Sequence, residues 1–411
     1  MPTRLLCALF AFPFALAAGC DRGAPHPESS AAVQLDVPTG QDARLPRLSG
    51  TDGKLWLSWV EPGPDGGHVL RYAALEDGAW STPVTVAAGA DWFINWADFP
   101  SVVPLPDGAA AAHWLVRSGD APYAYDVAIA VSPDGRDWRD PVTPHRDGTR
   151  TEHGFVSLFP DGDGIGAVWL DGRRMAGAAA TDHDHHDGAA GEAMTLRAGR
   201  LGRNGRLASE TELDPRTCDC CQTAAVLADA GPVVFYRDRS EDELRDIRFV
   251  RREDGAWGEP GLVAADRWRI AGCPVNGPAA AASGSRVVVA WFTAADDRPR
   301  VLAAFSDDGA RSFDPPRTVA EGSVSGRVGV VLLADDDAVV SWVATAADGA
   351  EIRYRRVAAA GNNGAPLILA RIASSRSAGF PQLARGGEGL VFAWTVPGEP
   401  ADVLSATVAV P

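Results

Sequence analysis

Long apolar runs of helical spacing are scarce in this 411-residue sequence, whereas turn-forming residues are abundant, with 44 glycines and 30 prolines. This balance excludes a helical bundle and favours short strands joined by tight turns. The hydrophobic content of 46% is ample for a packed core. Length alone does not divide the chain into domains, because all-β folds commonly run past about 200 residues as one unit.

Basic residues are also in short supply. The chain has 38 Lys and Arg against 54 Asp and Glu, which gives a formal net charge of -16. An acidic surface of this size repels phosphate backbones. We therefore expect no nucleic-acid partner, and we expect a monomer.

The first twenty residues have the pattern of an export signal. Arg4 is followed by an apolar run at 5–18 and small residues before Cys20, and the run is too short to span a membrane. The Gly-Cys ending resembles a bacterial lipoprotein signal, although the usual leucine stands one place early, at Leu16. The resemblance implies a signal peptide at 1–19, lipid on Cys20, and a periplasm-facing position in the cell envelope, on the inner or outer membrane. An ordinary cleaved signal or an uncleaved anchor is the alternative.

Residues 32–411, which follow a flexible Pro- and Ser-rich tether at 20–31, contain seven copies of one pattern. Each copy has an apolar strand, a turn with Asp or Gly, and a strand that ends in an aromatic residue. The aromatics are spaced 55, 55, 67, 55, 51 and 52 residues apart and are Trp59, Trp114, Trp169, Tyr236, Trp291, Trp342 and Trp394. Such a period with four strands per copy is typical of propeller blades. We therefore predict an all-β fold, a β-propeller of seven four-stranded blades forming a single domain.

The last copy has only three strands. Residues 32–37 (AVQLDV) are expected to supply the fourth and so to close the ring, which leaves no exposed sheet edge. The repeated aromatic residue is expected to pack blade against blade and has no assigned function.

An insertion at about 175–193 accounts for the longest spacing. It contains TDHDHHDG at 181–188, a polar stretch with no apolar face. The imidazoles of His183, His185 and His186 are candidate ligands for Zn, Ni or Cu. A solvated loop of this kind binds such ions weakly.

Two segments, SPDGRDW at 132–138 and SDDGARSF at 306–313, resemble the Asp-box of the sialidase superfamily, a turn between the third and fourth strands of a blade. The resemblance extends over residues 34–410 and implies a propeller, with six blades as the alternative because sialidases have six. It also implies that Arg44, in RLP at 44–46, is the first arginine of a clamp for a carboxylate.

The nucleophilic tyrosine of that superfamily has no counterpart in this chain. It would precede a late inner strand, where residues 322–330 read GSVSGRVGV. A retaining sialidase mechanism is therefore not expected, and whether the chain is an enzyme stays open.

Four cysteines remain when Cys7 leaves with the signal and Cys20 carries lipid: Cys218, Cys220, Cys221 and Cys273. All of them precede innermost strands of adjacent blades, on the face of the ring that we call the axial mouth. Export implies an oxidising compartment, so we expect a disulfide from Cys273 to the CDCC segment, with Cys218 and Cys221 as the candidate partners. A second bridge within CDCC is strained for adjacent residues, which predicts one or two free thiols.

Free thiolates beside His153 would form a soft site, for which copper or zinc is the expected metal. The alternative is a redox pair or a nucleophilic cysteine, because nearby arginines favour the thiolate.

The leading hypothesis is a lipid-anchored propeller that binds a small ligand or a soft metal at this Cys-lined mouth. A second is a glycan-active hydrolase, exo-α-sialidase-like but with altered catalytic residues, and a third is an envelope scaffold. The candidate catalytic residues for the hydrolase are Arg44, Asp98, Asp171 and Asp238. Each of these charged residues could instead serve only in salt bridges.

Overall fold

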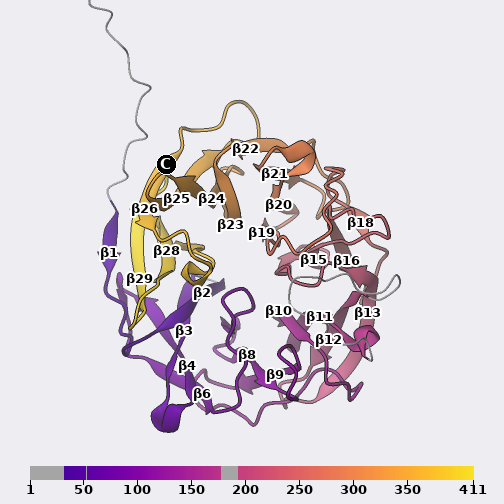
Figure 1. The fold of residues 1–411 in the computed structure, drawn as a ribbon, viewed down its shortest axis with the longest axis vertical. Coiled ribbons are helices and arrows are strands. Elements are labelled where there is room, and N and C mark those ends of the chain that lie inside the picture. Colours follow the sequence, from indigo (N-terminus) through magenta and orange to yellow (C-terminus); the bar gives the residue numbers. More distant parts are fainter. Residues whose placement is uncertain (1–31, 52, 177–192) are drawn as a thin grey trace, which may run out of the picture.

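The computed structural model describes residues 32–51, 53–176 and 193–411. In this part of the chain seven sheets follow one another around a ring, and the colours of Figure 1 run around it in sequence order. The fold is a seven-bladed β-propeller, as the repeats predicted, and the six-bladed alternative is wrong.

Each blade begins with its innermost strand. Blade 1 comprises β2 (Arg44–Thr51), β3 (Lys54–Pro62) and β4 (His68–Glu76), with β5 (Ala79–Trp80) and β6 (Val84–Gly89) both paired to β4. Blade 2 comprises β7 (Ser101–Pro104), β8 (Ala110–Arg117) and β9 (Tyr125–Ser132). Blade 3 comprises β10 (His153–Asp161), β11 (Gly164–Asp171), β12 (Met194–Leu201) and β13 (Leu207–Thr217).

Blade 4 comprises β14 (Ala224–Ala228), β15 (Gly231–Arg237) and β16 (Ile247–Glu253), with β17 (Ala256–Trp257) and β18 (Gly261–Leu262) both paired to β16. Blade 5 comprises β19 (Ala279–Ser283), β20 (Arg286–Thr293), β21 (Arg300–Ser306) and β22 (Arg317–Glu321). Blade 6 comprises β23 (Val324–Leu332), β24 (Ala338–Ala346), β25 (Gly349–Val357) and β26 (Leu367–Ile372). Blade 7 comprises β27 (Gln382–Gly386), β28 (Gly389–Val396), β29 (Asp402–Ala409) and β1 (Val33–Leu35). The described residues also form four short 3-10 helices, at Pro64–Gly66, Arg173–Met175, Ala295–Asp297 and Arg376–Ala378.

The two ends of the described chain close the ring. Strand β1 pairs antiparallel with β29, with Gln34 opposite Ala406, and the indigo β1 lies beside the yellow β29 in Figure 1. The Ser405 hydroxyl donates to the Leu35 carbonyl oxygen at 2.9 Å. The predicted closing strand is therefore confirmed.

Blade 2 differs from the expected four strands because its described sheet has three. At the fourth position only an isolated bridge forms, between Ile129 and Val142. Pro141 and Pro144 flank that bridge, and proline has no N–H to donate to a strand ladder.

The repeated aromatic side chains are buried in all seven blades, with at most 7% of their surface exposed. Trp291 of blade 5 illustrates their role, because it packs in one cluster with Val233 and Phe235 of blade 4. The interpretation of these residues as blade-to-blade packing is thereby confirmed.

Both Asp-box segments adopt the turn that the resemblance implied, directly after the third strands β9 and β21. Asp134 Oδ1 accepts hydrogen bonds from the backbone N–H groups of Arg136 and Asp137, both at 2.8 Å. Asp308 does the same for Arg311 and Ser312. The box aromatics Trp138 and Phe313 pack against the cores.

Residues 1–31, with Cys20, and the insertion with His183, His185 and His186 lie outside the described residues, so lipidation, tether and metal loop stay predictions. Within the described residues no helix has the length and hydropathy needed to cross a membrane.

Replacing Trp291 with Ala should lower the free energy of unfolding by about 3–5 kcal/mol, because it leaves a large cavity between two blades. Leu262→Ala is the control, since 45% of the surface of Leu262 is exposed and little packing is lost. Chemical denaturation followed by circular dichroism measures both. A loss for Trp291→Ala as small as that for Leu262→Ala would contradict the packing role.

Candidate functional site: a buried dithiol beside a disulfide

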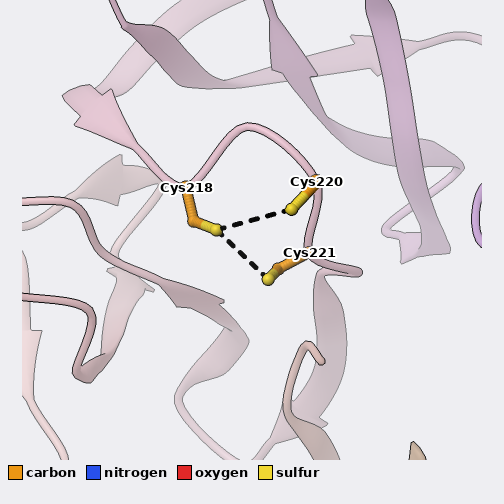
Figure 2. A group of neighbouring side chains, drawn as sticks. All are labelled: Cys218, Cys220 and Cys221. Atoms are coloured by element: carbon orange, nitrogen blue, oxygen red, sulfur yellow. Dashed lines mark hydrogen bonds between the residues drawn. The ribbon is translucent and has the colours of Figure 1, made fainter. Parts of the chain in front are cut away.

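The CDCC segment links β13 of blade 3 to β14 of blade 4. Its first residue is held in place because the Cys218 N–H donates to the Arg237 carbonyl oxygen at 3.1 Å. The Cys218 and Cys221 side chains are both buried, and their Sγ atoms lie 3.2 Å apart. Cys220 Sγ lies 4.0 Å from Cys218 Sγ, on the other side of the same turn (Figure 2).

Cys220 forms a disulfide with Cys273, which precedes β19 of blade 5, and their Cα atoms are 6.0 Å apart. The bridge therefore joins Cys273 to the CDCC segment as expected, but the partner is Cys220 instead of Cys218 or Cys221. The reason is the direction of the side chains. Cys218 and Cys221 turn into the protein toward each other, whereas Cys220 and Cys273 are both only partly buried.

A buried arginine faces the dithiol. Arg245 Nη1 donates to Cys218 Sγ at 3.2 Å, and Arg245 Nη2 donates to Glu243 at 2.7 Å. The guanidinium favours the charged form of Cys218, so when the pair loses a proton the thiolate forms on Cys218 and the Cys221 thiol donates to it.

The pKa values of the two thiols are pushed apart. Burial acts to raise the pKa of Cys218, but the hydrogen bond with Cys221 and the charge of Arg245 outweigh it and lower the pKa to about 7. Burial raises the pKa of Cys221 well above its ordinary value, and the neighbouring Cys218 thiolate raises it further. A thiolate beside a protonated thiol is the state that attacks disulfides.

Arg237 organises the same region through the backbone. Its guanidinium donates to the carbonyl oxygens of Asn276, Arg245 and Phe292 at 2.9, 2.6 and 2.7 Å. These bonds tie blade 4 to the segment that follows Cys273. Arg237 is buried, so its role is to hold the two halves of the cysteine site together.

A second polar group lies next to this segment. Gln222, which follows Cys221, donates to the Ala97 carbonyl oxygen at 2.6 Å. Asp98 directly follows Ala97 in the chain. The Tyr125 hydroxyl contacts Asp98 Oδ2 at 3.0 Å and Glu152 Oε1 at 2.7 Å. Sequence reasoning missed Glu152, although a carboxylate directly before an innermost strand was a visible signal.

Both of these carboxyl groups are protonated more readily than an ordinary carboxyl group. Burial raises the pKa of Asp98 to about 7 and that of Glu152 to about 8, although the Tyr125 hydroxyl lowers both. A hydroxyl has one proton, so a protonated carboxyl group donates in one of the two contacts. Asp98 also lines a cavity of about 20 Å³ together with Arg47 and His113, which holds about one water molecule.

The remaining site candidates are dispersed. Arg44 is paired with Asp42 at 2.6 Å, and 43% of its side chain is exposed. Asp238 pairs with Arg248 at 3.2 Å, and burial raises the pKa of Asp238 to about 6. His153 and Asp171 lie together, in a cluster with other carboxylates and not with the cysteines. The structure thus brings the four cysteines together and places His153 elsewhere.

No family model matches the chain, and no curated protein matches its sequence. Solved structures do resemble it. A protein of unknown function from Dyadobacter fermentans superposes with a TM-score of 0.52 at 13% identity, covering 94% of this chain and 100% of that one. At this identity the likeness shows the fold alone.

Sialidase-type and arabinofuranosidase propellers are among the other similar structures. A NanB sialidase from Streptococcus pneumoniae gives a TM-score of 0.48 at 8% identity, covering 87% of this chain and 83% of that one. A GH93 α-L-arabinofuranosidase of Fusarium graminearum gives 0.48 at 15% identity, covering 92% and 97%.

Ionisation of Cys218 should increase with pH, with a midpoint near the Cys218 pKa of about 7. Arg245→Gln removes the stabilising charge, so the midpoint should move upward. The ultraviolet absorbance of the thiolate, taken as the difference from the Cys218→Ser variant, measures both and needs no reagent to reach the buried sulfur. The exposed pair Arg298–Glu321 supplies the control Arg298→Gln, which should leave the midpoint unchanged. Identical midpoints in the wild type and Arg245→Gln would refute the role of Arg245.

Proposed function

We propose that this protein carries out thiol–disulfide exchange, with Cys218 as the nucleophile and Cys221 as its partner. One observation supports the proposal above all. Cys218 Sγ lies 3.2 Å from Cys221 Sγ, 3.2 Å from the Arg245 guanidinium and 4.0 Å from a sulfur of the Cys220–Cys273 bridge. A stabilised thiolate, a second thiol and a disulfide are thus in contact.

The exchange proceeds in two balanced steps. The Cys218 thiolate attacks Cys220 Sγ, which forms a Cys218–Cys220 bond and releases Cys273 as a thiolate that takes up a proton. Cys221 then loses its proton and attacks Cys218 Sγ, which forms a Cys218–Cys221 bond and releases Cys220. Two electrons pass from the buried pair to the partly exposed pair, and no external oxidant is consumed.

Exchange with another molecule takes place at the partly exposed pair, Cys220 and Cys273. Cys220 and Cys273 are accessible to solvent in part, whereas Cys218 and Cys221 are buried. An external disulfide is reduced at the Cys220/Cys273 thiols, and the buried pair stores the electrons. Such chemistry suits the envelope position that the N-terminal signal predicts, because disulfides form and exchange in exported proteins.

The close sulfur contact favours this chemistry over a soft-metal site. Two thiolates on one tetrahedral zinc ion, each about 2.3 Å from the metal, lie about 3.8 Å apart. The Sγ atoms of Cys218 and Cys221 are closer than that, at 3.2 Å. Cys220 is held in a disulfide and so offers no thiolate.

The hydrolase hypothesis has less support. Asp98, Asp171 and Asp238 have different partners, namely Tyr125, Arg173 and Arg248. The cavity that Asp98 lines has a volume of about 20 Å³, which holds about one water molecule and is too small for a sugar ring. No particular contact favours the scaffold hypothesis.

Cys221→Ser should trap the first step of the exchange. Without its partner thiol, Cys218 can attack Cys220 but the new bond cannot be resolved. Chains with a Cys218–Cys220 bond and a free Cys273 should therefore accumulate as the pH rises and Cys218 ionises. Peptide mapping by mass spectrometry, after acid quenching and without reduction, identifies the bond.

Cys218→Ser is the matched control, because it removes the nucleophile and should retain only the Cys220–Cys273 bond. Circular dichroism checks the fold of both variants. If Cys221→Ser also shows only Cys220–Cys273 at every pH, while Cys218 is free and can be alkylated, the proposal is wrong.

A further inference from the structure

A second group of polar side chains, most of them buried, lies between blades 2 and 3, apart from the cysteines. Asp126 belongs to β9, and His145 and Asp147 come from the segment between β9 and β10. His153 is the first residue of β10 and pairs in register with Asp171, the last residue of β11. Strand pairing thus fixes two members of the group, and the segment before β10 brings the others.

The surroundings of His153 determine where its proton lies. Its Nδ1 is 3.2 Å from the Thr151 carbonyl oxygen and 3.4 Å from that of Tyr125. Both are acceptors, so Nδ1 carries the proton. In metal sites a ligating histidine commonly donates its other N–H to a backbone carbonyl in this way.

The opposite nitrogen, Nε2, is completely buried and has no hydrogen-bond partner. It faces Asp147 Oδ2 at 3.3 Å and Asp171 Oδ1 at 3.7 Å. Asp147 Oδ2 also lacks a hydrogen bond, whereas Asp147 Oδ1 accepts from the Thr149 N–H at 2.9 Å. A lone pair therefore faces two carboxylates, an arrangement that a cation between them would stabilise.

His145 adds a second imidazole that faces the same carboxylates. Its ring stacks on that of His153, with centroids 3.8 Å apart and planes 5° from parallel. Its nitrogens also face acceptors, Asp147 at 3.3 Å and Asp126 at 3.9 Å. Two imidazolium ions in such contact would repel each other, so protonation of both rings does not solve the problem.

The charges of the group do not balance. Asp147 and Asp171 contact the guanidinium of Arg173, whereas the third carboxylate, Asp126, contacts the two imidazoles. Arg173 is shared with Glu210, whose charge Arg197 offsets at 2.8 Å. With neutral imidazoles the net charge is that of two uncompensated carboxylates, which a divalent cation cancels.

We propose that Asp147 Oδ2, His153 Nε2 and Asp171 Oδ1 bind a divalent transition-metal ion, with zinc as the best match. Imidazole and carboxylate together suit zinc, and donors about 2.0–2.1 Å from a tetrahedral ion lie about 3.3–3.4 Å apart. The spacings of 3.3 and 3.7 Å are close to that value. Arg173 is bonded to both oxygens of Asp171 at 2.7 Å, and these bonds hold the carboxylate in the orientation that a metal ligand needs.

Zinc binding is measured in a background without competing ligands. That background carries the substitutions His183→Ala, His185→Ala, His186→Ala, Cys218→Ser and Cys221→Ser. The two cysteine substitutions make the result independent of the proposed exchange. After chelator treatment, calorimetric titration with ZnCl₂ should show one site per chain, and zinc should raise the melting temperature. Asp147→Asn and His153→Gln should each weaken binding by at least about tenfold.

Two controls separate ligand loss from general damage. His113→Gln removes another buried histidine, which is bonded to Ser101, and Asp137→Asn removes an exposed carboxylate of the same blade. Both should bind zinc as the background does. The proposal is overturned if the folded background protein binds no zinc, in which case a proton on His153 balances the carboxylates instead. It is also overturned if folded Asp147→Asn binds zinc with unchanged affinity.

Discussion

Ring closure is the constraint on which the rest of this structure depends. A blade buries its faces only against its neighbours, so the two chain ends must pair, and β1 does so on β29. Closure fixes the segments before the innermost strands of adjacent blades next to each other on one face. The residues before β14 and β19, far apart in sequence, thereby lie close enough for the Cys220–Cys273 disulfide.

Burial gives that cysteine site its chemistry. A thiol in an apolar interior stays protonated, and Cys221 follows this rule. Cys218 departs from it because a guanidinium that is itself buried, Arg245, is held against the sulfur by Glu243. The same physical effect operates between blades 2 and 3, where the buried imidazole of His153 faces the carboxylates of Asp147 and Asp171. In both places the scaffold holds groups that would separate in water.

Much of the fold could be predicted from the sequence, because a repeat leaves the same local pattern in every blade. The aromatics from Trp59 to Trp394, the closing strand and the Asp-box turns all follow from short-range signals. The three-stranded sheet of blade 2 was missed, although Pro141 and Pro144 indicated the interruption.

The site was less accessible to such reasoning. The sequence was enough to predict that the four cysteines lie close together. Which of them bonds to Cys273 depends on the direction in which each side chain of a tight turn points. The two-residue spacing between Cys218 and Cys221, typical of redox dithiols, was present in the sequence and was not used. Tyr125, Glu152, His145 and Asp147 meet their partners only through the path of loops, which has no periodic signal.

The disulfide map of the wild-type chain in a graded series of glutathione redox buffers tests the central claim most directly. Exchange between the two cysteine pairs predicts that chains with one disulfide are a mixture, some bonded at Cys220–Cys273 and some at Cys218–Cys221. The account is contradicted if every chain with one disulfide keeps Cys220–Cys273 and the buried pair never forms a bond.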